Sequence, residues 1–327
     1  MNHLFAAALL GFSLGFASAT AAWGQDASAY PIKPVRVIAP YAPGGQSDTI
    51  MRAVAGKLTE KWNQPVVVEN RAGANGIIGA ELVSRSAPDG YTLIVAEGSL
   101  FTVHPGLYEK LPYDPVRDFA PITRLTTYKT VLVVHPSVPA NNLKDFVALV
   151  KAKPGSLSFG SFGQGSGGHL NMEALKLHLG LDIVHVPYKG SAPVMVDLVA
   201  GRLQTVLISV SSSANNVKSG KLRALAYAGA KRSPILPDVP TFAEAGAEFE
   251  NTSWFALMAP AGTPRPIIGR IYEEVTRIIR EPAFNQQWLA SRGLDVGGDT
   301  PDQLAELIRS ELPYWAKIIK AAGVKLE

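Results

Sequence analysis

The sequence of 327 residues contains no cysteine. This absence excludes disulfide bonds, thiol nucleophiles and cysteine-ligated zinc or iron–sulfur sites. Excess charge is also scarce, because 31 basic residues face 27 acidic ones and the net charge is only +4. Proteins that bind nucleic acid usually concentrate basic residues on one face, so we expect no nucleic acid among the partners. With 47% hydrophobic residues, the chain is long enough for about two domains.

The first 25 residues contain no aspartate, glutamate, lysine or arginine. Residues 4–22 are apolar and small, and they end in the triplets Ala17-Ser18-Ala19 and Ala22-Trp23-Gly24. This pattern predicts a signal peptide over residues 1–25, cleaved between Ala19 and Gln25, and a periplasmic mature protein. An uncleaved anchor is the alternative, since about 20 apolar residues can span a bilayer. No cysteine follows the apolar run, so we expect no lipid anchor.

Short apolar runs alternate with amphipathic runs through the rest of the chain, which is typical of β-α-β units around a parallel sheet. The expected strands are residues 35–39, 65–69, 92–96, 130–134, 157–160, 183–186, 203–208, 222–228 and 254–258. The expected helices are residues 48–62, 76–86, 143–153, 169–179, 192–200, 267–280, 282–292 and 303–322. Residues 112–121 are rich in proline, and we interpret them as a connection.

The C-terminal part of the chain has too few strands to form a domain of its own. The simplest arrangement returns it to the first lobe, so that residues 26–130 and 253–327 form one lobe and residues 131–252 the other. Two crossover strands then join the lobes and leave a cleft between them. The sequence therefore predicts an α/β fold of two lobes.

Two glycine-rich loops, residues 40–48 (PYAPGGQSD) and 161–169 (SFGQGSGGH), each follow a predicted strand and open a helix. The first N–H groups of a helix have no partner within it, and the helix dipole makes this end electropositive, which suits an anion. One helix end contributes only about 0.3–1 kcal/mol, whereas micromolar binding requires about 8 kcal/mol. We therefore expect the two loops to act together across the cleft. The alternative for each loop is a plain helix start.

The sequence offers little support for a cofactor or a metal. Gly163, Gly165 and Gly168 match the dinucleotide pattern G-x-G-x-x-G, but the next predicted strand ends without the acidic residue that would hold the ribose. His169 and Glu173 have the i, i+4 spacing of a metal pair, although a histidine at a helix start beside a surface carboxylate explains them better. We expect no cofactor and no metal.

Catalytic patterns are equally weak. Neither H-E-x-x-H nor G-x-S-x-G occurs. Ser166 and His169 can be interpreted as the nucleophile and base of an exported hydrolase, but no acidic residue is placed to orient the histidine. We expect that the protein is not an enzyme and keep this hydrolase as the alternative.

Several separated motifs follow one another along the chain: PYxPGGxxD at 40–48, NRxGAxG at 70–76, PDGYT at 88–92, LPYDPxxDF at 111–119, GxGSxxHL at 163–170, PYKG at 187–190, VPTxxEAG at 239–246 and APAGTP at 259–264. By these motifs the sequence from Tyr30 to Val324 resembles the Bug/TctC family, the exported solute receptors of tripartite tricarboxylate transporters. The resemblance implies a type II periplasmic-binding-protein (Venus flytrap) fold that closes on a small organic carboxylate. It also implies membrane permease subunits as partners, and we expect a monomer. A ligand-sensing module for a membrane signalling partner is a further alternative.

The resemblance also implies a ligand site, because the two glycine-rich loops hold the ligand carboxylate in this family. Its residues are Tyr41, Pro43, Gly44, Gly45, Asp48 and Ser99 from the first lobe and Ser161, Phe162, Gly163, Gly165, Ser166, His169 and Tyr188 from the second. Phe162 replaces a small residue, which favours a narrower pocket or an aromatic ligand unless the ring faces outward. Gln204 and residues 209–213 lack the acidic groups usual there, which favours a plain mono- or dicarboxylate over an amine-bearing ligand.

Overall fold

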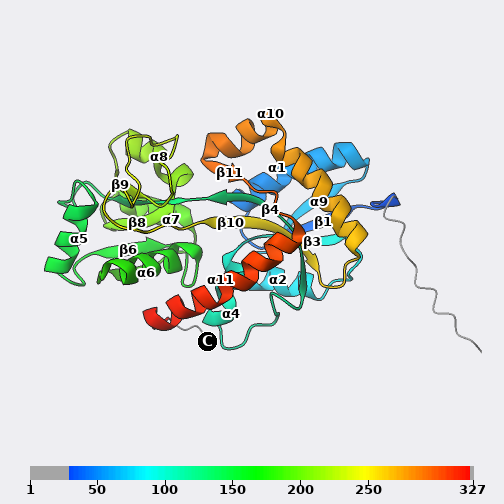
Figure 1. The fold of residues 1–327 in the computed structure, drawn as a ribbon, viewed down its shortest axis with the longest axis horizontal. Coiled ribbons are helices and arrows are strands. Elements are labelled where there is room, and N and C mark those ends of the chain that lie inside the picture. Colours follow the sequence, from blue (N-terminus) through cyan, green and yellow to red (C-terminus); the bar gives the residue numbers. More distant parts are fainter. Residues whose placement is uncertain (1–28, 325–327) are drawn as a thin grey trace, which may run out of the picture.

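The computed structural model describes residues 29–324, so the predicted signal peptide lies outside the described residues. These residues form two lobes, each built around its own β-sheet (Figure 1). Within this range, no helix combines the length and the apolar character needed to cross a membrane. The expected two-lobed α/β fold is confirmed.

Lobe 1 is the part of the molecule around a six-stranded sheet of order β11-β4-β10-β3-β1-β2. Its strands are β1 (Val35–Ala39), β2 (Val66–Asn70), β3 (Thr92–Glu97), β4 (Phe119–Tyr128), β10 (Ser253–Pro260) and β11 (Leu294–Val296). Its helices are α1 (Gln46–Trp62), η2 (Ala74–Gly76), α2 (Ile77–Ser84), α3 (Ser99–Thr102), α4 (His104–Leu107), α9 (Arg265–Arg280), α10 (Pro282–Phe284), the π-helical turn η3 (Asn285–Leu289), η4 (Ala290–Arg292) and α11 (Pro301–Ala322).

Lobe 2 is the part around a five-stranded sheet of order β7-β6-β8-β5-β9. Its strands are β5 (Thr130–Val134), β6 (Ser158–Ser161), β7 (Val184–Pro187), β8 (Thr205–Ser209) and β9 (Arg223–Tyr227). Its helices are α5 (Leu143–Ala152), α6 (Gly167–Leu179), α7 (Ser191–Val199) and α8 (Val210–Lys218). Within each sheet the strands that precede the glycine-rich loops, β1 and β6, pair in parallel with their neighbours.

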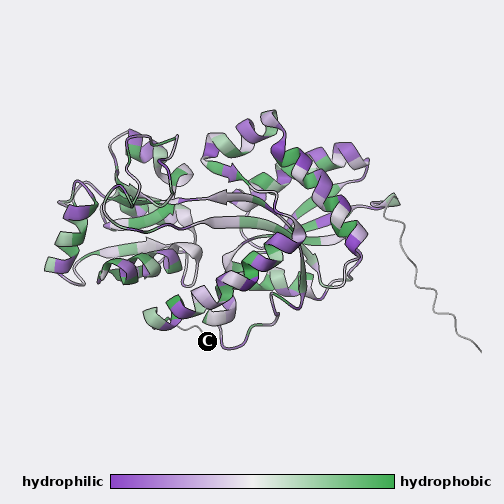
Figure 2. Ribbon diagram, in the orientation of Figure 1, coloured by the Kyte–Doolittle hydropathy of each residue, from purple (hydrophilic) through white to green (hydrophobic). Residues whose placement is uncertain are grey.

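The core follows from the alternation of side chains along the strands. In β1, Val35 and Val37 belong to the apolar cluster on one face of the sheet, and Ile38 belongs to the cluster on the other. Helix α1 covers the first face with Ile50 and Val54, which recur at the helical spacing of four and are fully buried. Hydrophobic and hydrophilic residues alternate along the helices in Figure 2, as the amphipathic pattern requires.

The lobes are joined by adjacent segments of chain. Strands β4 and β10 pair antiparallel along their whole length and run side by side towards lobe 2 (Figure 1). The chain leaves β4 at Lys129 and enters β5 immediately, and it returns just before Ser253. At this junction the Thr130 hydroxyl donates to Asn251 Oδ1 at 3.0 Å. A short double connection of this kind suits a hinge.

Helix α11 connects the lobes a third time. Leu304 and Ile308 pack in the core of lobe 1, whereas Ile319 is buried beside Leu170 of α6 in lobe 2. The C-terminal helix therefore packs on the first lobe, and its last turns also contact the second.

Three local expectations were wrong. Residues 112–121 are not wholly a connection, because β4 begins at Phe119. Its Thr123 and Thr126 are buried, and their hydroxyls donate to the carbonyls of Asp299 and Asp295 at 2.8 and 2.6 Å. The serine-rich stretch after Ser209 forms α8, which the sequence did not predict. The single helix expected over residues 282–292 is divided among α10, η3 and η4.

Alanine substitutions at two glycines should change the stability in opposite directions. A Cβ at Gly98 would lie 2.7 Å from Cδ2 of the buried Trp254, whereas a Cβ at Gly56 of α1 would meet no described heavy atom within 4 Å beyond its chain neighbours and the backbone of its own helix. We expect Gly98→Ala to lower the free energy of unfolding by about 1–3 kcal/mol, and Gly56→Ala to raise it by about 0.5–1 kcal/mol. Urea unfolding measures both, and equal stabilities for the two variants would contradict this packing.

Candidate functional site

A cleft of about 1110 Å³ lies between the lobes. Lobe 1 lines it with residues 40–47, 49–50 and 72–76 and with Glu97, Tyr128, Phe255 and Arg292. Lobe 2 lines it with Thr130, Phe162, Ser166, Gly168, Asn171, residues 189–193, Leu207, Ser209, Ser211 and Ser212. Both glycine-rich loops therefore border one shared space, as the sequence predicts.

The first glycine-rich loop presents the N-terminus of α1 to this cleft. Gly45 precedes the helix in an extended conformation, and no side chain of the described residues caps it. The first backbone bond of the helix runs from the Thr49 amide to the Gly45 carbonyl at 2.9 Å. The amides of Gln46 and Ser47 therefore have no acceptor within the helix, and both residues line the cleft.

Asp48 holds the first loop in shape from behind. Its buried carboxylate accepts hydrogen bonds from the Gly44 amide at 3.0 Å, from Arg52 Nε at 3.0 Å and from Asn70 Nδ2 at 2.9 Å. Burial alone would raise the pKa of Asp48, but these three donors lower it below its ordinary value. Gly44 has a φ of +82°, which a side chain would disfavour. Asp48 thus folds Gly44 back towards the helix.

The second glycine-rich loop presents the N-terminus of α6. The Ser166 hydroxyl donates to the Gly163 carbonyl at 2.7 Å and accepts from the His169 amide at 3.4 Å, so it caps the helix. The Gly165 amide donates to His169 Nδ1 at 3.0 Å. The amides of Gly167 and of Gly168, which lines the cleft, come first in the helix and have no acceptor within it.

Two stacked imidazoles support this loop. The rings of His169 and His185 lie 3.7 Å apart between centroids and 10° from parallel. Burial, aided by the neighbouring His185, lowers the pKa of His169 to about 3, and burial lowers the pKa of His185 to about 4. Both rings are therefore neutral at pH 7, so His169 Nδ1 can accept the Gly165 amide. The pair positions the loop.

The geometry does not assemble the hydrolase or the metal pair considered above. The Ser166 hydroxyl is engaged with backbone groups, and Nδ1 of His169 is occupied by the Gly165 amide. Glu173 Oε1 lies 3.9 Å from His169 Nε2 but 2.7 Å from Lys176 Nζ. In the part of the chain that the structure describes, no group of three potential metal ligands gathers.

Two more helix ends face the cleft, and the sequence did not predict them as part of the site. Helix α7 begins after Gly190, whose φ is +107°, and its first residues Ser191 and Ala192 line the cleft. Helix α8 begins after Ser209, whose hydroxyl contacts Ser211 and Ser212 at 3.1 and 2.9 Å. Gly190 followed by serine was the available signal for α7. The floor residue Tyr128 and the basic wall residues Lys189 and Arg292 were also missed.

The thirteen expected site residues fall into two groups. Six line the cleft: Tyr41, Pro43, Gly44, Gly45, Phe162 and Ser166. Seven lie outside its lining: Asp48, Ser99, Ser161, Gly163, Gly165, His169 and Tyr188. Several of the second group hold their neighbours, as Ser161 does through a 2.7 Å bond to His185 and Tyr188 through a 2.9 Å bond to Asp197. That any of the thirteen contacts a ligand stays a prediction.

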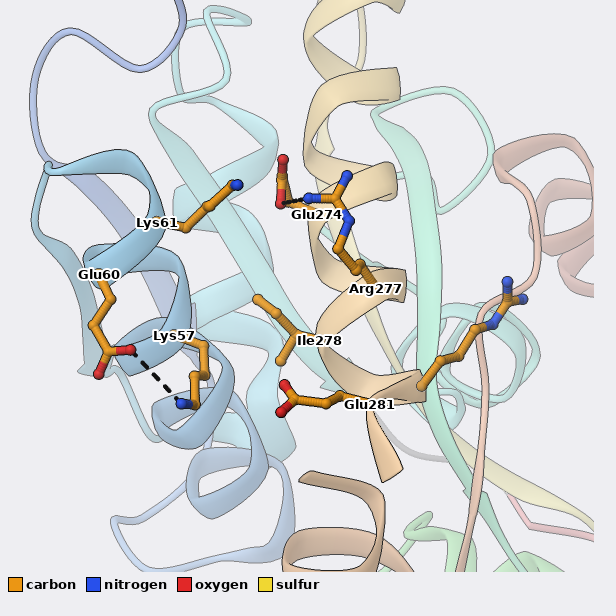
Figure 3. A pocket seen from close by; sticks show the side chains of 8 residues that line it. Lys57, Glu60, Lys61, Glu274, Arg277, Ile278 and Glu281 are labelled. Atoms are coloured by element: carbon orange, nitrogen blue, oxygen red, sulfur yellow. Dashed lines mark hydrogen bonds and ion pairs between the residues drawn. The ribbon is translucent and has the colours of Figure 1, made fainter. Parts of the chain in front are cut away.

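A second hollow, of about 630 Å³, lies on lobe 1 between α1 and α9 (Figure 3). Its walls are charged, but the charges pair with one another: Lys57 lies 3.7 Å from Glu60, and Arg277 lies 2.7 Å from Glu274. Such mutual pairing leaves little net charge to select a ligand. The interlobe cleft, bordered by four helix N-termini, is therefore the candidate site.

Two lobes joined by adjacent strands, with helix N-termini bordering the cleft between them, are the architecture of a solute-binding protein. Residues 50–324 match the family model described as the tripartite tricarboxylate transporter family receptor, TctC, and the chain belongs to this family. BugT of Bordetella pertussis is 36% identical over 329 residues, covering 100% of both proteins. The solved structure of R. palustris Rpa4515 with adipate has a TM-score of 0.83 and 33% identity, covering 90% of this chain and 99% of that one. MatC from Rhodopseudomonas palustris with bound malate has a TM-score of 0.79 and 31% identity, covering 89% and 100%.

The expected membership in the Bug/TctC family is therefore confirmed, and with it the assignment as a solute-binding receptor of that family.

The stacked imidazoles predict that acid weakens the fold. The pKa values of His169 and His185, about 3 and 4, lie below the ordinary 6.5, so the unfolded chain binds protons that the folded protein does not. The free energy of unfolding should fall as the pH drops through about 6.5, by about 1.4 kcal/mol per pH unit for each such proton, and level off only near the folded pKa values. Urea unfolding at a series of pH values measures this slope.

A matched pair of variants separates titration from packing. His185→Gln removes one imidazole whose pKa is lowered by folding. The free energy of unfolding should therefore depend less steeply on pH, by about 1.4 kcal/mol per pH unit, which corresponds to one proton fewer bound on unfolding. Phe159→Leu, which alters a ring stacked 4.8 Å from His185, should lower stability at every pH and keep the slope. An unchanged slope in His185→Gln would contradict the role of the pair.

Proposed function

We propose that this protein captures a small organic carboxylate in the interlobe cleft and delivers it, in the periplasm, to the membrane permease of a tripartite tricarboxylate transporter. The observation that carries the proposal is the meeting of the α1 and α6 N-termini, one from each lobe, in a single cleft. The relatives solved with adipate and with malate support a carboxylate ligand. We further propose residues 1–25 as the export signal, residues 26–130 with 253–327 and residues 131–252 as the two lobes, and a monomer as the working form.

The energetics require both lobes. A hydrogen bond to a charged group contributes about 1.5–3 kcal/mol, and micromolar binding needs about 8 kcal/mol beyond the cost of association. Two amides from one helix end, such as those of Gln46 and Ser47, therefore fall short. Adding Gly167 and Gly168 from the opposite lobe doubles the number of donors, so a ligand held by both ends favours the closed arrangement.

The lobes already touch across the mouth of the cleft. Gln46 Nε2, in the first turn of α1, donates to the Ser211 hydroxyl of α8 at 3.2 Å. This bond joins the two walls directly, and rotation at Lys129 would separate them. In this proposal, rotation at Lys129 both closes the lobes around the ligand and opens them to release it.

The walls favour a ligand with one or two carboxylates. Lys189 and Arg292 contribute two cations, while the first turn of α8 contributes uncharged serines. Gln204 does not line the cleft, and its Oε1 accepts hydrogen bonds from the Ser158 amide at 3.0 Å and from the Ser158 hydroxyl. The absence of an acidic residue at this position therefore does not alter the charge of the cleft wall.

A thermal-shift panel tests the function. Malate, succinate, adipate, citrate and benzoate are compared with aspartate, glucose and ATP on the mature protein. At least one simple carboxylate should stabilise the fold, by about 2.7 kcal/mol at a free concentration of 100 times its Kd, and glucose and ATP should not. Stabilisation by glucose or ATP with none by any carboxylate would contradict the proposal.

A bulky side chain in the cleft tests the site. Ala192 is exposed at the start of α7 and lines the cleft, whereas Ala152 is exposed at the end of α5. Ala192→Trp should weaken carboxylate binding roughly tenfold or more, a loss of about 1.4 kcal/mol per factor of ten, while folding persists. Ala152→Trp should bind as the unaltered protein does in calorimetry. Equal affinities for the two variants would place the ligand elsewhere.

A further inference from the structure

A half-buried carboxyl group forms part of the cleft lining. It belongs to Glu97, the last residue of β3, which lines the cleft. Its Oε1 accepts from the Tyr128 hydroxyl at 2.5 Å, and its Oε2 accepts from the Ser99 hydroxyl at 3.2 Å. Lobe 2 approaches it closely too, since a Cβ on Gly167, the first residue of α6, would lie 2.8 Å from Glu97 Oε1.

This carboxyl group faces hydroxyls rather than cations. The titratable groups that act on it are Tyr128, from β4, and Tyr41, from the loop after β1, and α6 presents only its glycine N-terminus. Within the described chain, neither Lys189 nor Arg292 nor any other cation is among the groups that shift the pKa of Glu97. Burial raises this pKa, and the bonds from Tyr128 and Ser99 only partly oppose the effect.

An anionic ligand at the α6 N-terminus would share this enclosed space with Glu97. Two carboxylates in one buried site cannot both stay ionised at low cost, so the pKa of one of them rises strongly. The amides of both helix ends stabilise the charge on the ligand. Glu97 has no comparable set of donors, so it is the group that takes the proton.

We propose that Glu97 takes up one proton from solvent when the ligand binds, and that its neutral carboxyl group donates a hydrogen bond to the ligand carboxylate. The inference rests on the proposed carboxylate ligand. The Tyr128 hydroxyl continues to donate to Oε1, and the proton resides on Oε2. Glu97 thereby becomes the residue that couples capture of the anion to capture of a proton.

Calorimetry across pH tests this coupling. The probe is the simple carboxylate of the panel, among malate, succinate, adipate, citrate and benzoate, that stabilises the protein most. As the pH rises through and beyond the raised pKa of Glu97, the affinity should fall by up to tenfold per pH unit, because Glu97 then ionises in the free protein. Repeating the titration in buffers of different ionisation heats should show uptake of up to one proton.

Three variants test whether Glu97 is the group that takes up the proton. Glu97→Gln mimics the neutral acid, so it should bind the probe with an affinity that no longer depends on pH. Tyr128→Phe removes a donor that favours the ionised form, so the fall in affinity should move to higher pH, and this shift should vanish when Glu97→Gln is also present. The matched control is Glu311→Gln: Glu311 is a half-buried acid with a raised pKa whose Oε1 accepts from Trp254 Nε1 at 3.0 Å, and it lies outside the cleft lining. This control should keep the original pH dependence.

The outcomes separate the two proposals. Tight binding that is independent of pH in the unaltered protein, or a pH dependence that survives Glu97→Gln, overturns the proton coupling and leaves the function standing. Loss of binding in Glu97→Gln together with preferred binding of aspartate also overturns it, because Glu97 would then be an ionised partner for an ammonium group. Absence of stabilisation by every carboxylate overturns the function and the coupling together.

Discussion

The site depends on backbone amides at helix starts that have no acceptor within their own helix. These groups are fixed by the fold rather than by side chains, so they need little reorganisation to receive an anion. Helix α1 brings Gln46 and Ser47 from lobe 1, and α6 brings Gly167 and Gly168 from lobe 2. Each pair alone is weak, so the binding energy becomes available mainly when the lobes approach. Under the proposed function, ligand capture and closure would be a single event.

The residues behind the wall keep these amides in place. Asp48 anchors Gly44 on one side, and the neutral His169 anchors Gly165 on the other. Between the lobes, Lys129 connects β4 to β5, and the last turns of α11 pack on α6 through Ile319 and Leu170. The proposed closure would therefore have to move this helix contact as well as bend the strands, and would couple the C-terminal helix to the position of the second loop.

Much of this arrangement could be predicted from the sequence, and the failures have physical causes. The alternation of apolar side chains in β1 and the four-residue apolar spacing in α1 are local patterns that the sequence shows directly. The glycine-rich loops are likewise evident from their composition. Strand β4 was missed because Thr123 and Thr126 look polar, although distant carbonyls satisfy them. That Asp48 and His169 contact the ligand stays a prediction. Their contacts with Arg52, Asn70 and His185 could not be predicted, because these partners are brought together only by the fold.

A crystal structure of the protein with a bound carboxylate tests the joint grip most directly. We expect the carboxylate oxygens about 3 Å from backbone nitrogens in the first turns of both α1 and α6, with the mouth closed over them. A ligand held by one lobe alone, or seated in the charged hollow between α1 and α9, would contradict it.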